Sequence, residues 1–263
     1  MPSVSNIAVG ALVAGAAASK ARHGMNESIA RLSTGMRSMY GGDAAGQSVA
    51  NTLEARSKSW AMAARNAEDG ISASQVVESA LLEIAALAQR LRELGIQADN
   101  AALHQSASDT AALNAEAAAI GDAMDAIRDN TTFNGVTLLS STDTSINIGV
   151  TDGGATVGLT FKLVACTAGV TAAAAADTNA DAVLEDVAIS LGNVAAGIAA
   201  LKGRQAVAYS ASANLAAAAA RVEDTDFAKE TANLTKNSVL NQSAMAMVAQ
   251  ANQAQSSILA VLQ

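Results

Sequence analysis

The sequence has few of the residues that fill a thick globular core or interrupt a helix. Only 2% of its 263 residues are aromatic although 51% are hydrophobic, and alanine is the largest part of that apolar content. Alanine favours helix but fills little volume, whereas aromatic side chains normally supply the large contacts of a core. The only proline is Pro2, so no proline interrupts a later helix. These absences predict slender packing of helix on helix.

Reactive and metal-binding side chains are also scarce. The single Cys166 excludes an intramolecular disulfide, and we expect it to be a small buried side chain. The two histidines, His23 and His104, lie far apart and lack the spacing of metal ligands. A zinc protease would need two histidines four residues apart on a helix with a catalytic glutamate. We therefore expect no catalytic residues, no metal, no cofactor and no enzymatic activity.

Positive charge is limited. The formal net charge of -8 and the pI near 4.7 argue against a nucleic-acid partner. Between residues 138 and 201 the only cation is Lys162, so we expect this acidic segment to be a solvent-exposed surface. The apolar run at 7–19 is short for a membrane span and has no Lys or Arg before it, so we expect no membrane insertion and no secretory leader.

Both ends of the chain instead carry long helical patterns. Their apolar residues recur at alternating gaps of three and four, which keeps one stripe of a helix facing a partner, as in a coiled coil. We expect the two end helices to pack together, which favours assembly over chemistry. The residues expected to pack there are Ile7, Ala11, Leu32, Leu240, Ala244, Met247, Ala251 and Ile258.

The middle of the chain predicts longer helices around a small sheet. Helices are expected at about 44–97, from a cap at Ser106 or Ser108 to about 130, and from about 184 to 220. Alternating apolar residues around Asp152-Gly153-Gly154 predict a β-hairpin within about 136–166, followed by a variable loop at 167–178. The stripe expected to pack these helices is Leu81, Ile84, Leu91, Ile120, Met124, Leu191 and Ile198.

The predicted fold is mainly α: a long coiled-coil-like helical rod with a small central β-hairpin and both termini at one end. We divide it into an inner core domain made of 1–36 and 222–263, and a rod domain at 37–221. Leu91 continues the packing stripe, and Leu94 is expected at its edge. Ion pairs between the long helices are expected to join arginines and acids drawn from Arg56, Arg65, Arg90, Arg92, Glu54, Glu68, Asp69, Glu93 and Glu116.

Seven short segments resemble elements of the bacterial flagellins, the subunits of the flagellar filament. They follow the order of that family and are divided between the two ends of the chain. They are RLSTG at 31–35, DAAG at 43–46, RNAEDGIS at 65–72, QRLREL at 89–94, TFNG at 132–135, RVEDTDFA at 221–228 and VAQANQ at 248–253. The connector at 37–43 departs from the family, because it is slightly shorter and lacks the paired acid before Ala44.

The resemblance implies a secreted, extracellular subunit that polymerises with itself into the filament used for swimming. It also implies an export chaperone and a filament cap as partners, and the end helices as the innermost layer around a hollow core. An innate immune receptor recognises the family at a patch that corresponds here to Arg90, Leu94 and Glu116. The alternatives are a hook–filament junction protein or another helical surface-assembly protein; the segments at 248–253 and 221–224 favour flagellin.

Overall fold

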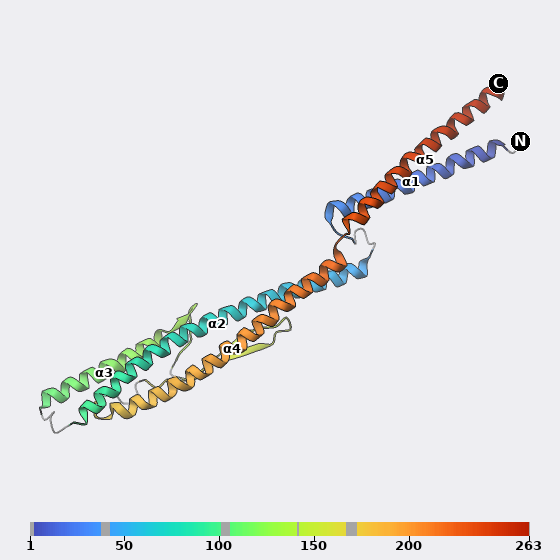
Figure 1. Cartoon of the computed structure of the whole chain (residues 1–263). Coiled ribbons are helices and arrows are strands. Elements are labelled where there is room, and N and C mark those ends of the chain that lie inside the picture. Colours follow the sequence, from blue (N-terminus) through green and yellow to red (C-terminus); the bar gives the residue numbers. More distant parts are fainter. Residues whose placement is uncertain (1–2, 38–42, 101–105, 141, 167–172, 263) are drawn as a thin grey trace. The chain divides into compact units, whose positions relative to one another are not determined.

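The computed structural model describes residues 3–37, 43–100, 106–140, 142–166 and 173–262, and side chains from residue 9 to residue 257 within these ranges (Figure 1). The mainly α fold with a small β element is confirmed. The five helices are α1 (Ser3–Thr34), α2 (Ala44–Ala98), α3 (Ala107–Asn130), α4 (Ala176–Glu223) and α5 (Phe227–Leu262). The short elements are β1 (Thr132–Phe133), β2 (Val136–Thr137), β3 (Thr144–Gly149), β4 (Thr156–Phe161) and the 3-10 helix η1 (Ala173–Ala175).

The chain forms two compact units. The first contains residues 1–55 and 215–263, and the second contains residues 56–214. The division therefore falls inside α2 and α4 and not at residues 36 and 221, where the sequence suggested it. The residues that follow α1 are paired through their backbone with those at the end of α4. Met36 bridges to Asp224, and the Arg37 N–H donates to the Glu223 carbonyl at 2.7 Å. This pairing keeps both connectors in the first unit.

The second unit has a dense aliphatic core between α2, α3, α4 and the β3–β4 hairpin. Along α2, residues Val77, Leu81, Ile84 and Leu91 are fully buried. They pack with Met124 of α3 and with Val187, Val194 and Leu201 of α4, while Ile120, Leu191 and Ile198 lie partly buried at the margin of the same core. A three- and four-residue repeat of this kind keeps one face of a long helix against its neighbours.

The prediction that Leu94 lies at the edge of this stripe is wrong, because Leu94 is 0% exposed, as Leu91 is. The start of α4 packs closely on this end of α2. A Cβ added to Gly95 would lie 2.4 Å from the backbone nitrogen of Asp177. Only a glycine permits that approach, and it covers the side of α2 that the stripe alone left open.

The β3–β4 hairpin covers part of this core with one face. Its strands are antiparallel, with Ile146 opposite Leu159 and Ile148 opposite Val157, and Leu159 and Phe161 are buried. The β1–β2 hairpin was not anticipated from the sequence. Its signal was present, however, because Asn134-Gly135 takes positive φ at both residues, as a tight two-residue hairpin turn requires.

The acidic segment at 138–201 is not a wholly exposed surface, and the variable loop at 167–178 is shorter than predicted. Residues 167–172 lie outside the described part of the chain, η1 begins at Ala173, and α4 begins at Ala176. Ala173 is buried, and its N–H donates to the Oδ1 of Asn114 on α3 at 2.8 Å. The acids of the segment alternate with apolar residues such as Leu138 and Phe161 that enter the core.

Cys166 is a buried side chain, as the sequence predicts. Burial raises the pKa of its thiol to about 11. The reactive form of cysteine is the thiolate, so the thiol is protonated and inert at neutral pH. Within the described ranges no three His, Cys, Asp or Glu side chains gather as a metal site would require, and His104 falls outside those ranges.

Two helical segments, Ala44–Ala98 and Ala173–Glu223, are long and apolar enough to cross a membrane by length and composition. This is weak evidence for a membrane span, because core helices of soluble proteins pass the same test. Both segments take part in the packed core of the second unit.

Candidate functional site

Helices α1 and α5 pack antiparallel along each other in the first unit (Figure 1). Gly24 faces Asn237, and the Arg22 guanidinium, two residues earlier on α1, reaches Asn241, four residues later on α5. At the other end of the pair Arg31 lies 3.7 Å from Glu230. The start of α1 and the end of α5 therefore lie at the same end of this unit.

The stripe of α5 that faces α1 is rotated from the predicted one, because it keeps Ala244 and Ala251 but not every predicted position. Asn241 and Val248 are half-buried, whereas Leu240 and Met247, predicted to pack in the seam, are exposed. Asn237 enters the same stripe. The shift is possible because α1 accommodates these amides: the Nε of Arg22 donates to Asn241 at 3.4 Å.

Gly24 makes room for the second amide. A Cβ at this position would lie 2.7 Å from the Nδ2 of Asn237, so a larger residue would force that side chain to move. Of the other residues predicted to pack here, Ala244 is buried, and Ala11, Leu32 and Ala251 are half-buried. The side chains of Ile7 and Ile258 lie outside the described residues.

The interior of the α1–α5 unit is made of small side chains. Among its described residues, every buried hydrophobic side chain is an alanine: Ala18, Ala21, Ala50, Ala219 and Ala244. A methyl group contributes about 0.8 kcal/mol when buried, against about 1.5–3 kcal/mol for a larger aliphatic side chain. The pair is therefore held together weakly for helices of this length.

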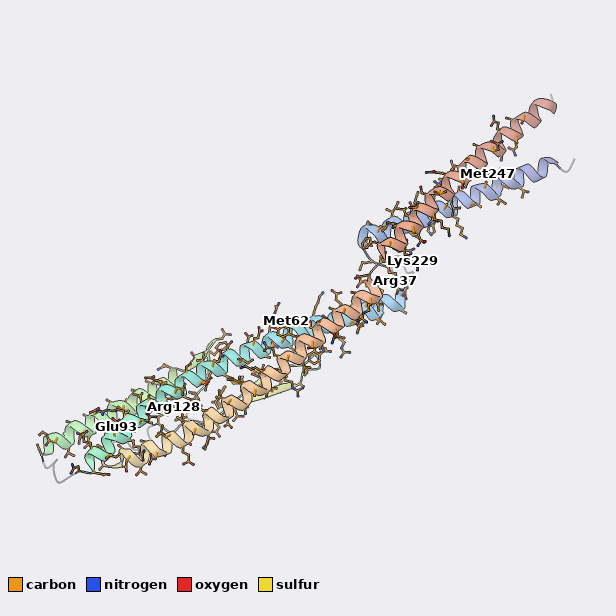
Figure 2. The ribbon with its side chains drawn as sticks, in the orientation of Figure 1. Arg37, Met62, Glu93, Arg128, Lys229 and Met247 are labelled. Atoms are coloured by element: carbon orange, nitrogen blue, oxygen red, sulfur yellow. The ribbon has the colours of Figure 1, made fainter. Side chains whose placement is uncertain are left out.

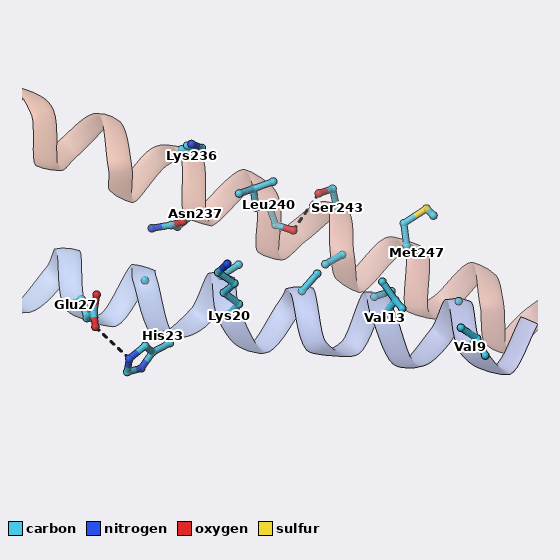
Figure 3. Close-up of a pocket in the computed structure, with 16 residues that line it drawn as sticks. Val9, Val13, Lys20, His23, Glu27, Lys236, Asn237, Leu240, Ser243 and Met247 are labelled. Carbon is cyan, nitrogen blue, oxygen red and sulfur yellow. Dashed lines mark hydrogen bonds and ion pairs between the residues drawn. The ribbon is translucent and has the colours of Figure 1, made fainter.

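Larger aliphatic side chains lie on the outside of this pair. A groove between α1 and α5, which we call the α1–α5 groove, is lined by Val9, Val13, Leu240 and Met247 together with alanines (Figure 3). Val13 and Met247 are each 64% exposed. Exposed apolar patches of this kind are typical of interaction surfaces.

The distal part of the pair carries no charge. Neither residues 3–19 of α1 nor residues 237–262 of α5 contain an Asp, Glu, Lys, Arg or His. Charged side chains begin at Lys20 and Lys236, which line the part of the groove nearer the connectors (Figure 3). Many copies of this segment could therefore pack closely without bringing like charges together.

The connectors are fixed by helix caps. Asp226 is the N-cap of α5, because its Oδ1 accepts the N–H groups of Ala228 and Lys229 at 3.0 and 3.2 Å. Gly35 closes α1 with φ +74° and donates its N–H to the Arg31 carbonyl at 2.8 Å. Segments 31–35 and 221–228, far apart in the sequence, thus meet at one place.

A single acid at the end of the connector at 37–43 has two roles. Asp43 accepts the Gly46 N–H at 2.8 Å as the cap of α2, and its other oxygen accepts from Arg37 at 2.8 Å. A Cβ at Gly46 would overlap the Asp43 carboxylate, so a larger residue there would force that side chain to shift. The start of α2 is therefore capped and ion-paired by Asp43 alone, although there is no paired acid before Ala44.

The second unit contains the other predicted patch. Arg90 of α2 donates to Glu116 of α3 at 2.7 Å and to Glu93 at 2.9 Å, and the hydrogen bond to Glu116 is the main cause of its raised pKa. The side chains of Arg90 and Glu116 are about half exposed. Leu94 lies in the core and cannot present its side chain at this surface.

Other predicted arginine partners differ from those observed. Arg56 pairs with Asp152 at the β3–β4 turn at 2.7 Å, and Arg92 pairs with Asp181 of α4 at 3.0 Å. Glu68 accepts from the Tyr209 hydroxyl at 2.6 Å. The sequence could not supply these partners, because they depend on which turn and which helix lie beside α2.

Comparisons with known proteins cover most of the chain. Residues 6–144 match the bacterial flagellin N-terminal helical region, and residues 178–262 match the bacterial flagellin C-terminal helical region. A flagellin of Halalkalibacterium halodurans is 35% identical over 245 residues, covering 88% of this chain and 89% of the relative. A flagellin of Bacillus subtilis is 34% identical over 276 residues, covering 88% and 90%. Flagellin A of Vibrio cholerae is 39% identical over 159 residues, covering 59% and 41%.

Proposed function

Because this chain belongs to the bacterial flagellin family, we propose that α1 and α5 form the surface through which its subunits polymerise. As a flagellin the chain is a structural subunit of the flagellar filament, which serves motility. The alternative of a hook–filament junction protein is not favoured by the family matches. The proposal assigns the polymerising contact to particular side chains of the first unit.

The observation that carries the proposal is the inverted packing of this unit. Its buried hydrophobic residues are alanines, while many of its larger aliphatic side chains are exposed. Those exposed residues include Val9, Leu12, Val13, Val239, Leu240, Met245 and Met247. Covering each of them fully would contribute about 1.5–3 kcal/mol, which is the burial that the isolated pair lacks. Packing against neighbouring subunits would supply it, so that polymerisation stabilises the pair.

The distribution of charge supports the same surface. The first unit has equal numbers of acidic and basic residues, so the net charge of -8 belongs to the second unit. Copies of a neutral unit can pack together without the self-repulsion that a net charge brings. A contact between different faces of identical subunits, if it does not close into a ring, continues into an open helical filament.

Charge placed in the α1–α5 groove should abolish polymerisation. Val13→Asp and Met247→Asp lie in the uncharged part of the groove and would each bury an unpaired carboxylate between subunits, at a cost of several kcal/mol, and we expect no sedimenting filaments at concentrations where the unaltered protein assembles. The matched controls are Asn26→Asp and Gln242→Asp, which add the same charge at exposed polar positions of the same helices. Electron microscopy and sedimentation measure the outcome. Normal filaments from both groove variants would refute the proposal.

We propose that the protein has no catalytic role, which is supported by its membership of a structural family. As a filament component it is exported from the cell, and we propose that it functions as a secreted, extracellular protein. We also propose an export chaperone and a filament cap as partners. The exposed aliphatic side chains of α5 support the proposal of a chaperone, because a bound partner would shield them from water before assembly.

We propose that Arg90 and Glu116 form the surface that an innate immune receptor recognises. The support is their position across α2 and α3, where the two side chains are exposed and held in one geometry by their hydrogen bonds. Arg90→Ala should weaken binding of the monomer to the receptor at least about tenfold, because charged contacts at an interface commonly contribute that much. Arg92→Ala is the control, since Arg92 lies two residues away with similar exposure and pairs elsewhere. Equal binding by both variants in a surface-binding assay would contradict the assignment.

A further inference from the structure

We propose that Met247 is an oxidation-sensitive site, at which conversion of the thioether to the sulfoxide prevents polymerisation, while oxidation of the nearby Met245 does not. The inference rests on the proposed role of the α1–α5 groove in assembly. It goes further by assigning a chemical modification to one residue of that groove and by distinguishing it from a neighbour two positions away on α5 (Figure 2).

The methionines differ in their access to an oxidant. Met247 is 64% exposed, Met62 of α2 is 51% exposed and Met245 is 48% exposed, whereas Met124 is fully buried in the second unit. Oxidation of methionine depends on access to the sulfur. In the folded α1–α5 pair Met247 is therefore the most exposed of the methionines whose side chains are described, and Met124 is protected in the core of the second unit.

The reaction requires a hydroperoxide, with hydrogen peroxide as the simplest example. The sulfur of Met247 attacks one peroxide oxygen, the O–O bond breaks, and that oxygen becomes the sulfoxide oxygen while the other leaves as water. The sulfur is oxidised by two electrons and the peroxide is reduced by two. The product replaces a flexible apolar side chain by one with a strong hydrogen-bond acceptor.

The surroundings of Met247 are apolar. Met247 lines the same part of the groove as Val9 and Val13 of α1 (Figure 3). The charged donor Lys20 lies farther along the groove, opposite Leu240 (Figure 3). Ser243, one turn away on α5, donates its hydroxyl to the Leu240 carbonyl at 3.0 Å. The α1 side chains that line this part of the groove are aliphatic, so they offer no donor to a sulfoxide at Met247.

Met245 has a different neighbour. Its sulfur lies 3.4 Å from the Nη2 of Arg22, which donates toward it from α1. A sulfoxide oxygen on this sulfur would keep the guanidinium as a donor, and a hydrogen bond to a charged donor is among the stronger ones in proteins. Oxidation at Met245 would therefore leave no unsatisfied acceptor when subunits pack together.

The two positions predict different consequences for assembly. A buried acceptor without a donor costs the full desolvation of that group, whereas a satisfied one costs little. Oxidation at Met247 should therefore raise the subunit concentration needed for filament growth, and oxidation at Met245 should not. In the filament the groove would be covered, so the sensitive stage is the unassembled subunit.

The test uses glutamine as a neutral polar substitute for the sulfoxide and leucine as a substitute that cannot be oxidised. Met247→Gln should raise the critical concentration for seeded growth at least about tenfold, whereas Met245→Gln should change it less than about threefold. After treatment of free subunits with hydrogen peroxide, Met247→Leu should still assemble, while the unaltered protein, Met245→Leu and Met62→Leu should not. Mass spectrometry of tryptic peptides would confirm which sulfurs are oxidised.

Protection by Met245→Leu or Met62→Leu equal to that by Met247→Leu would overturn the assignment, as would unchanged growth of Met247→Gln. The Val13→Asp variant separates the two proposals. If Val13→Asp fails to assemble while Met247→Gln assembles normally, the groove is the polymerising surface and the oxidation proposal is wrong. If both variants assemble normally, the proposed function of the groove fails as well.

Discussion

Deletion of residues 240–263 should leave a soluble, largely helical monomer that forms no filaments at any accessible concentration. The deletion removes most of the partner of α1 and one wall of the α1–α5 groove, including Leu240 and Met247. It does not remove any residue of the aliphatic core at 56–214. We expect a complete loss of assembly, because neighbouring subunits would have no α5 groove surface to pack against. Sedimentation after addition of filament seeds measures the result.

The folded state of the truncated chain is the necessary control. The main unfolding transition reports the core of the second unit, and we expect its free energy to change by less than about 0.5 kcal/mol, as for changes far from a core. Circular dichroism should show that most helix is retained. Normal filaments from the truncated chain would show that α5 is dispensable, whereas loss of the main transition would show that the two units fold together.

Leu94→Ala should destabilise the monomer as strongly as Leu91→Ala, by about 2–5 kcal/mol each. Both side chains are 0% exposed and belong to one core with α3 and α4. Truncation of a buried leucine removes its transfer free energy and leaves a cavity that a rigid core fills only partly. From the sequence alone, Leu91→Ala would be expected to destabilise the monomer clearly more than Leu94→Ala. Urea unfolding of the monomer, followed by circular dichroism, gives the free energies to compare.

Leu82→Ala on the same helix is the matched control. Leu82 is 57% exposed, so its truncation should change the free energy of unfolding by less than about 0.5 kcal/mol. The comparison holds helix, residue type and helix propensity constant and varies only burial. If Leu94→Ala resembled Leu82→Ala, the close approach of α4 at Gly95 would be wrong in solution.

The contrast between the two units gives the family's assembly a physical basis in this chain. One unit buries leucine, isoleucine, valine and phenylalanine and can be stable by itself. The other buries alanine and exposes its larger aliphatic residues. If α1 and α5 form the polymerising surface as proposed, the subunit has one part that folds by itself and one part whose stability depends on its neighbours. Polymerisation and ordering of α1 and α5 would then be one process.

The sequence by itself determined the helices and their main stripe. The spacing of Leu81, Ile84 and Leu91 defines one face of α2, because 3.6 residues per turn place residues three and four apart on the same side. The cap at Ser106 and the hairpin at Asp152-Gly153-Gly154 follow from local chemistry. The resemblance of seven segments to flagellin was also present in the sequence, and the family matches confirm it.

The tertiary structure decided which residues lie at the margins of each stripe. A repeat predicts the centre of a helix face, but whether Leu94 is covered depends on the start of α4 meeting Gly95. The α5 stripe differs from the predicted one because Gly24 leaves room for Asn237 and Arg22 donates to Asn241. Leu240 and Met247 are therefore exposed. Ion pairs such as Arg56 with Asp152 also required knowledge of neighbouring elements. Periodicity fixes the direction of side chains around one helix, whereas burial depends on contacts between segments distant in sequence.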